Sequence, residues 1–126
     1  MQHFLNMADC IFCKIISGAA PANLVYQEDD IIVIHDIHPI AETHLLVIPR
    51  KHIDSLNGLI HEEEALASRL LLTVPKVAVL ILGENPSYRI LSNTGAKSGQ
   101  TVFHLHLHII SGRPLAYTNT ISGFFS

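Results

Sequence analysis

The chain contains one stretch, HLHLHII at residues 104–110, in which imidazole and aliphatic side chains alternate strictly. Successive side chains of a β-strand point to opposite faces of the sheet, so this period of two predicts a strand. We expect the strand to cover residues 101–110 and to carry three imidazoles on one face, about 6.5–7 Å apart. The opposite face would enter the core with Leu105, Leu107 and Ile109. Imidazoles are costly to bury without a task, so the pattern indicates a functional site rather than packing.

The composition sets the class of protein. Of the 126 residues, 48% are apolar and 15% are charged, which is typical of one compact domain rather than a disordered chain. With 8 Lys and Arg against 11 Asp and Glu, the formal net charge is −3. Nucleic-acid binding depends on cations that neutralise phosphates, so no nucleic-acid partner is expected. Residues 1–9 carry neither a basic region nor a long apolar run, and we expect a cytoplasmic protein without a secretory signal.

Apolar periodicity and turn residues divide the chain into seven elements. The expected elements are a short helix over 10–17, strands over 24–27, 31–36, 43–50, 88–93 and 101–110, and a long helix over 61–82. Asp9 would cap the short helix, Gly18 would close it, and no regular element is expected from Ser111 onward. This order predicts an α+β fold with an antiparallel sheet of about five strands. We expect a single domain over residues 1–126, with a body over about 10–113 and an irregular tail over 114–126.

The second half of the long helix, residues 74–82, is apolar on nearly every side. One sheet cannot cover the whole circumference of such a helix, so a second subunit is its natural cover and a homodimer is expected. Pro75 should kink or break the helix, because proline lacks the backbone N–H that the helix uses. Arg69, Pro75 and Lys76 interrupt the apolar run over residues 65–82, which favours a buried helix and argues against a membrane partner.

Two chemistries fit three neighbouring imidazoles. One is a catalytic zinc site with three histidine ligands and an open position. The other is attack on phosphorus by an imidazole nitrogen, with a second imidazole as proton donor or phosphate clamp. The loop before the strand, TGAKSGQ at residues 94–100, offers small residues and many donors, and this favours a phosphate pocket. Cys10 and Cys13 form a separate pair, whose Cys-x-x-Cys spacing indicates metal or redox chemistry.

These motifs together resemble the histidine triad family. HLHLHII matches its His-φ-His-φ-His-φ-φ signature, where φ is an apolar residue. The resemblance extends over CIFCKIISG, IVIHDIHPIAETHLLVIPRKHI and LSNTGAKSGQTVFHLHLHIISGR, and so over residues 10–113. The chain is most similar to the nucleotide-binding branch that hydrolyses purine nucleoside phosphoramidates, and this implies a homodimer with the α+β fold of the family.

The resemblance implies a catalytic role for three histidines. His106, the middle residue of the triad, would attack the α-phosphorus of a purine nucleoside phosphoramidate or an aminoacyl adenylate. The product of this step is a nucleotidyl-imidazole, from which water releases the nucleoside monophosphate. A neutral imidazole is a competent nucleophile near pH 7. His108 would contact a phosphate oxygen, and His44 would support the site.

The resemblance also implies a nucleotide pocket. Asp36 matches the family position that holds the ribose hydroxyls, and a carboxylate can accept hydrogen bonds from both. His35 would lie beside Asp36 in the nucleoside pocket. Thr101 stands where many relatives have serine, and both side chains carry a hydroxyl. Val102 would be a further nucleotide contact. The purine would lie against Ile11, Phe12, Ile15 and Ile37, and the phosphate would be positioned by Asn93, Gly99 and Thr101.

Family members with the N-terminal cysteine pair bind zinc, and the resemblance implies such a site here. Its ligands would be Cys10, Cys13, His52 and His104, a closed Cys₂His₂ set that is structural rather than catalytic. His104 would then serve the metal and leave His106 free to react.

Other readings of the same residues stay open. One alternative is an enzyme that cleaves dinucleoside polyphosphates, as related branches of the family do. A second is a non-catalytic regulatory module that binds a nucleotide without turnover. A third is a metallohydrolase that holds zinc in the triad itself. The chain also departs from the phosphoramidase branch, because it has no Trp and its C-terminal segment reads RPLAYTNTISGFFS. In that branch the segment reaches the active site of the partner subunit, so this departure concerns substrate preference near the leaving group.

Overall fold

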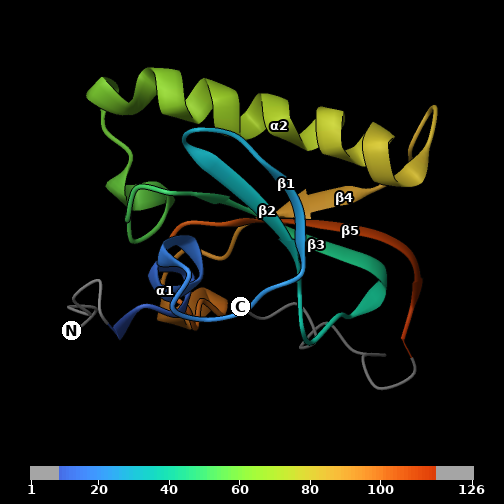
Figure 1. The fold of residues 1–126 in the computed structure, drawn as a ribbon, viewed down its shortest axis with the longest axis horizontal. Coiled ribbons are helices and arrows are strands. Elements are labelled where there is room, and N and C mark those ends of the chain that lie inside the picture. Colours follow the sequence, from blue (N-terminus) through green and yellow to red (C-terminus); the bar gives the residue numbers. More distant parts are fainter. Residues whose placement is uncertain (1–8, 116–126) are drawn as a thin grey trace.

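The computed structural model describes residues 9–115, which form a five-stranded antiparallel sheet between two helices (Figure 1). The strands lie in the order β1-β2-β3-β5-β4. Their bounds are β1 Leu24–Gln27, β2 Ile31–His35, β3 Ala41–Pro49, β4 Arg89–Leu91 and β5 Leu107–Pro114. Helix α1, Ile11–Ser17, and helix α2, Glu64–Leu82, cover opposite faces of the sheet. The predicted α+β fold is therefore confirmed, whereas residues 116–126 of the predicted tail lie outside the described residues.

The central strands alternate between two hydrophobic cores. Ile31 and Val33 of β2 point towards α2, while Ile32 and Ile34 of the same strand point towards α1. We call residues 104–110 the triad segment. The larger core, under α2, contains the three aliphatic residues that alternate with its histidines, as predicted: Leu105, Leu107 and Ile109. The triad imidazoles are thereby directed to the α1 side of the sheet.

Helix α1 begins one residue later than predicted, and its cap is a cysteine. Cys10, not Asp9, is the N-cap, and its sulfur accepts a hydrogen bond from the backbone N–H of Cys13 at 3.4 Å. Gly18 closes the helix in the left-handed conformation, as expected. The prediction for Asp9 was wrong because the Cys10 sulfur itself satisfies the exposed N–H group at the start of the helix.

Helix α2 is continuous through Pro75, so the predicted break does not occur. The carbonyl that loses its partner belongs to Leu71, four residues earlier, and Leu71 is exposed, so water can satisfy this group. The preceding turn, His61–Glu63, is a 3₁₀-helix rather than the first α-helical turn. By length and composition the stretch His61–Leu82 could cross a membrane, but in the structure one side of α2 packs on the sheet.

Strand β5 begins and ends later than predicted. Val47 pairs with Leu107, and the same register would place Leu105 opposite Pro49, which has no N–H to donate. The backbone N–H of Leu105 instead donates to the carbonyl of Ile53 at 2.6 Å. Residues 104–106 are therefore not part of the strand. At the other end, Ser111–Pro114 continue to pair with β3 across a bulge, which corrects the expectation of an irregular segment there.

Candidate active site

The three triad imidazoles are all buried but face three different environments. His104, His106 and His108 expose 0%, 2% and 1% of their surface. Regular strand structure begins only at Leu107, so the first two histidines lie in the segment before the strand. His104 turns to the cysteine pair, His106 lies against Phe12, and His108 contacts a further histidine on β3.

His106 is held in one tautomer by the backbone. Its Nδ1 lies 2.7 Å from the carbonyl oxygen of His104, which can only accept, so Nδ1 carries the proton. Its Nε2 is buried and has no hydrogen-bond partner in the described part of the chain. The ring of Phe12 packs edge-on at 5.0 Å between centroids. Burial lowers the pKa of His106, so the Nε2 lone pair is available at neutral pH.

His44 and His108 form a second hydrogen-bonded chain with a defined direction. The backbone N–H of Ile40 donates to His44 Nδ1 at 3.1 Å, so the proton of the neutral His44 ring lies on Nε2. This Nε2–H donates to His108 Nδ1 at 2.8 Å. The proton of His108 is therefore on its Nε2, which is buried and unpartnered among the described residues. The site thus combines a bare acceptor on His106 with a free donor on His108, in rings whose centroids are 5.1 Å apart.

Asp36 links these histidines to the surface. Its Oδ1 accepts from the backbone N–H of His38 at 2.8 Å, and its Oδ2 lies 3.3 Å from His44 Nε2. The carboxylate therefore has a fixed orientation and keeps acceptor capacity towards the adjacent pocket.

An apolar pocket of about 250 Å³ opens beside Phe12 and Asp36. Eight of the ten predicted nucleotide-binding residues line it: Ile11, Phe12, Ile15, His35, Asp36, Ile37, Thr101 and Val102. Asn93 and Gly99 do not line this pocket. Five further residues that the sequence reasoning did not assign to the site complete its wall: Pro21, Ala22, Ile34, His38 and Leu46. The alternation of β2 and β3 carries a signal for Ile34 and Leu46, which share the α1 face of the sheet, whereas nothing local indicates Pro21 and Ala22.

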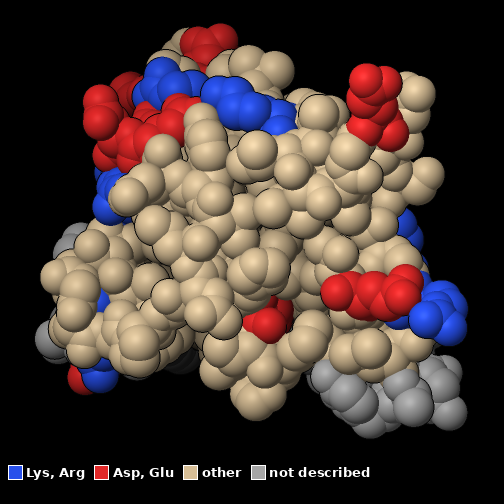
Figure 2. All heavy atoms as spheres, turned by 45° about the vertical axis from the view of Figure 1, so that its right-hand side comes forward, with Lys and Arg blue, Asp and Glu red and all other residues tan. Residues whose placement is uncertain are grey.

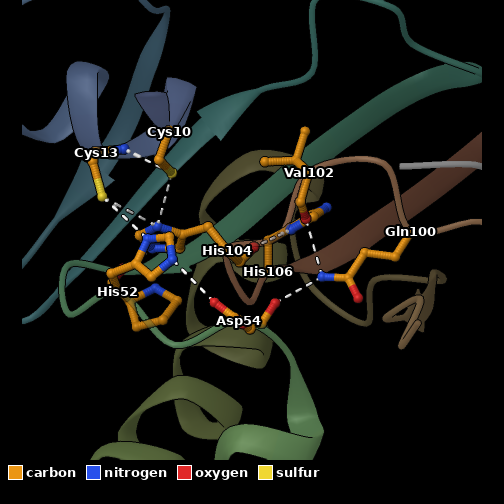
Figure 3. Close-up of polar contacts among 9 residues, drawn as sticks. Cys10, Cys13, His52, Asp54, Gln100, Val102, His104 and His106 are labelled. Carbon is orange, nitrogen blue, oxygen red and sulfur yellow. Dashed lines mark hydrogen bonds and ion pairs between the residues drawn. The ribbon is translucent and has the colours of Figure 1, made fainter. Parts of the chain in front are cut away.

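The structure brings together the four residues predicted as metal ligands (Figure 3). Their ligand atoms all lie within 4.8 Å of one another. Cys10 Sγ is 3.4 Å from His104 Nδ1, and Cys13 Sγ is 3.3 Å from His52 Nδ1. A tetrahedral zinc ion separates a sulfur and a nitrogen ligand by roughly 3.6 Å, so the spacing fits this ion. We call Cys10, Cys13, His52 and His104 the four-ligand cluster.

The outer hydrogen bonds of the four-ligand cluster direct both imidazole lone pairs inward. His104 Nε2–H donates to the carbonyl of Pro49 at 2.7 Å, and His52 Nε2 lies 3.2 Å from Asp54 Oδ1. Each ring therefore presents an unprotonated Nδ1 to the cysteines, as metal-binding histidines do. Burial and the neighbouring Cys10 raise the pKa of the Cys13 thiol to about 11, opposite to the lowered pKa of a redox-active pair.

A second group of possible ligands, Asp36, His44 and His108, is less suited to a metal. The lone pair of His44 Nδ1 is used by the Ile40 N–H, and its Nε2 carries a proton that points into the group. Among the described residues, neither group of possible ligands contains all three triad histidines. This geometry does not support the metallohydrolase reading.

The loop before the triad is ordered by Gln100 rather than left open. The sequence suggested Gln100 as a donor near the imidazoles, but its carboxamide is fully used inside the protein. Its Oε1 accepts from the N–H of Gly95, and its Nε2 donates to the carbonyls of Asp54 and Val102. Thr94, at the start of the same loop, has a buried hydroxyl with no hydrogen-bond partner within the described region.

Burial of neutral His108 makes the stability of the protein depend on pH. Burial, together with His106 and His44, lowers the pKa of His108 to about 3 from its ordinary value near 6.5. As the pH falls below about 6.5, the unfolded chain binds a proton that the folded protein does not, so stability falls. Between pH 7 and pH 5, urea denaturation should show wild type losing about 2 kcal/mol more than His108→Asn, which keeps an acceptor for His44. Parallel pH profiles for the two proteins would contradict this assignment.

Comparison with known proteins places the chain in a family. The HIT domain model matches residues 17–115. An uncharacterized HIT-like protein of Synechocystis is 44% identical over 109 residues, covering 86% of this chain and 95% of the relative. The purine nucleoside phosphoramidase of Escherichia coli is 37% identical over 107 residues, covering 85% of this chain and 90% of the enzyme.

Solved structures agree with the sequence match. The crystal structure of a HIT family hydrolase from Legionella pneumophila has a TM-score of 0.78 and 37% identity, covering 89% of this chain and 100% of the other. The sheet and the triad segment described above both lie within the matched residues. The chain belongs to the HIT domain family.

Proposed function

We propose that this protein is a hydrolase that cleaves purine nucleoside phosphoramidates or aminoacyl adenylates at the α-phosphorus. His106 Nε2 forms a bond to phosphorus while the bond from phosphorus to the leaving nitrogen or oxygen breaks. The leaving amine takes up a proton from solvent water, whereas a carboxylate leaves without one. Water then attacks the nucleotidyl-imidazole, restores His106 and releases the nucleoside monophosphate.

The observation that carries this proposal is the state of His106. The hydrogen bond to the His104 carbonyl keeps Nδ1 protonated, so the lone pair on Nε2, in the plane of the ring, is available to an electrophile. Phe12 contacts this ring and also lines the apolar pocket. A flat apolar base in the pocket would therefore lie close to the nucleophile. The similarity to a purine nucleoside phosphoramidase supports this choice of substrate.

The remaining groups suit an anionic substrate. His108 Nε2–H is a preorganised donor for a phosphoryl oxygen, on which negative charge is concentrated during attack. Asp36 borders the pocket and is the proposed acceptor for the ribose hydroxyls. Thr101 lies in the same pocket wall and is a proposed phosphate contact. Asn93 and Gly99 lie outside this wall, and we propose that they also contact the phosphate.

Substituting the nucleophile tests the reaction directly. His106→Ala should lower kcat for adenosine 5′-phosphoramidate by about 1,000-fold or more, since the variant lacks the lone pair proposed to attack phosphorus. The measurement is amine release, together with mass spectrometry of rapidly quenched enzyme for an adenylate bound to His106. The matched control is His61→Ala, which removes an exposed imidazole and should leave both readouts unchanged.

The same assay separates the alternative functions. Equal rates for wild type and His106→Ala would remove His106 from the mechanism. Tight binding of adenosine monophosphate without turnover of any substrate would favour the regulatory module. Faster cleavage of dinucleoside polyphosphates than of phosphoramidates would move the substrate to that class.

We also propose that the four-ligand cluster binds structural zinc. The support is the donor set, the ligand spacing and the two outer hydrogen bonds that orient the imidazoles. Bound zinc would supply a fixed crosslink among α1, the segment after β3 and the triad segment. His106 lies outside the ligand set and remains the nucleophile.

Metal analysis of purified variants tests the zinc site. Wild type should contain one zinc per chain, and Cys10→Ser or His52→Ala should lower this content at least tenfold, because each removes one of four ligands. His106→Ala should retain the metal. Zinc that persists in both ligand variants and is lost in His106→Ala would place the metal in the triad instead.

We further propose a homodimer through the outer face of α2. One side of the helix packs on the sheet, while the rest of its surface exposes large apolar side chains: Leu71, Leu72, Val79 and Leu80. The edge strand β4 adds Ile90, which is 43% exposed. Figure 2 shows that the side carrying the C-terminal end of α2 has a broad area without charged residues. Apolar patches of this kind mark protein interfaces.

A charge placed in this face should separate the subunits. Analytical ultracentrifugation of wild type should give a molecular mass of twice the 13.9 kDa of one chain. Leu80→Asp should raise the dissociation constant of the dimer by about 100-fold, because it places a carboxylate in the interface. The matched control is Leu24→Asp, at an exposed leucine of β1. A monomeric wild type, or a dimer unaffected by Leu80→Asp, would contradict this interface.

A further inference from the structure

A hydrogen-bonded chain runs from the four-ligand cluster to the loop before the triad (Figure 3). His52 belongs to the cluster, and its outer nitrogen lies 3.2 Å from the side chain of Asp54. The backbone carbonyl of the same Asp54 accepts a hydrogen bond from Gln100 Nε2 at 2.7 Å. Asp54 therefore contacts the proposed metal ligand His52 with its side chain and the loop residue Gln100 with its backbone carbonyl.

Gln100 is the junction of this chain. The residue is only 3% exposed, and its side chain makes three hydrogen bonds inside the protein, which use the amide oxygen and both N–H groups. They reach Gly95 at the start of the loop, Val102 in the pocket wall and Asp54 behind the cluster. Its carboxamide thus fixes the two ends of the loop relative to each other and both relative to the cluster. Loss of these bonds would leave one buried N–H and two carbonyls to find other partners.

A second route connects the cluster to the same pocket. The ring of His104 belongs to the cluster, while its backbone carbonyl accepts the Nδ1–H of His106. Phe12 lies on α1 between two cluster cysteines, and its ring packs edge-on against both His104 and His106. Ordering the cluster therefore orders both the proposed nucleophile and the wall of the pocket.

We propose that Gln100 is a positioning residue that couples metal binding at the four-ligand cluster to nucleotide binding in the pocket. This inference rests on the proposed function and adds a relation between two sites. A metal that orders His52 and Asp54 lowers the cost of ordering the loop, and a nucleotide that orders the loop lowers the cost of ordering the cluster. Linkage requires that each ligand raises the affinity of the other by the same factor.

Calorimetry with adenosine monophosphate as the probe measures this coupling. Zinc-loaded wild type should bind the nucleotide at least tenfold more tightly than protein stripped with a chelator, in samples whose circular dichroism shows that both are folded. Competition with a chromophoric chelator should show that saturating adenosine monophosphate raises zinc affinity by the same factor. In zinc-loaded protein, Gln100→Met should bind the nucleotide at least tenfold more weakly than Gln27→Met, which alters an exposed glutamine of β1.

The outcomes distinguish this inference from the proposed function. In Gln100→Met, and in Gln100→Asn if the first variant does not fold, zinc should no longer change nucleotide affinity. Equal nucleotide affinity in loaded and stripped wild type would overturn the coupling and leave the proposed hydrolase intact. An unchanged ratio in the Gln100 variants would overturn the role of Gln100 alone. Absence of nucleotide binding to zinc-loaded wild type would overturn the proposed function itself.

Discussion

The hydrogen bond from His106 Nδ1–H to the carbonyl of His104 determines what the site can do. A backbone carbonyl can only accept, so it fixes the proton on Nδ1 and leaves Nε2 as a lone pair. Beside it, the chain from Ile40 through His44 fixes the opposite polarity on His108, which presents an N–H. Two chemically identical rings become an acceptor and a donor because the groups behind them differ.

The fold supplies these partners through the pleat of the sheet. Alternation sends the aliphatic residues of the triad segment under α2 and its imidazoles towards α1. Pro49 has no N–H to extend the sheet, so residues 104–106 leave the strand register and His104 can reach the cysteine pair. The start of β5 therefore separates the four-ligand cluster from the candidate active site within five residues.

Much of this arrangement could be predicted from the sequence, because periodicity and short motifs are local signals. The five strands, both helices and most of the pocket residues were predicted. The four-ligand cluster comes together as the resemblance to the histidine triad family implied. Its cysteines, Cys10 and Cys13, precede the residues matched by the family model. The start of β5 could not be predicted, since it depends on where a distant strand meets a proline. The hydrogen bonds of the Gln100 side chain could not be predicted either, because the fold as a whole decides which groups lie next to it.

The tautomer of His106 tests the account most directly, and nitrogen-15 NMR of the imidazole rings near neutral pH measures it. The account predicts that Nδ1 of His106 bears the proton while Nε2 has the chemical shift of an unprotonated nitrogen, and that His108 shows the reverse pattern. A proton on Nε2 of His106 in the folded protein would contradict it, because the lone pair proposed to attack phosphorus would then be absent.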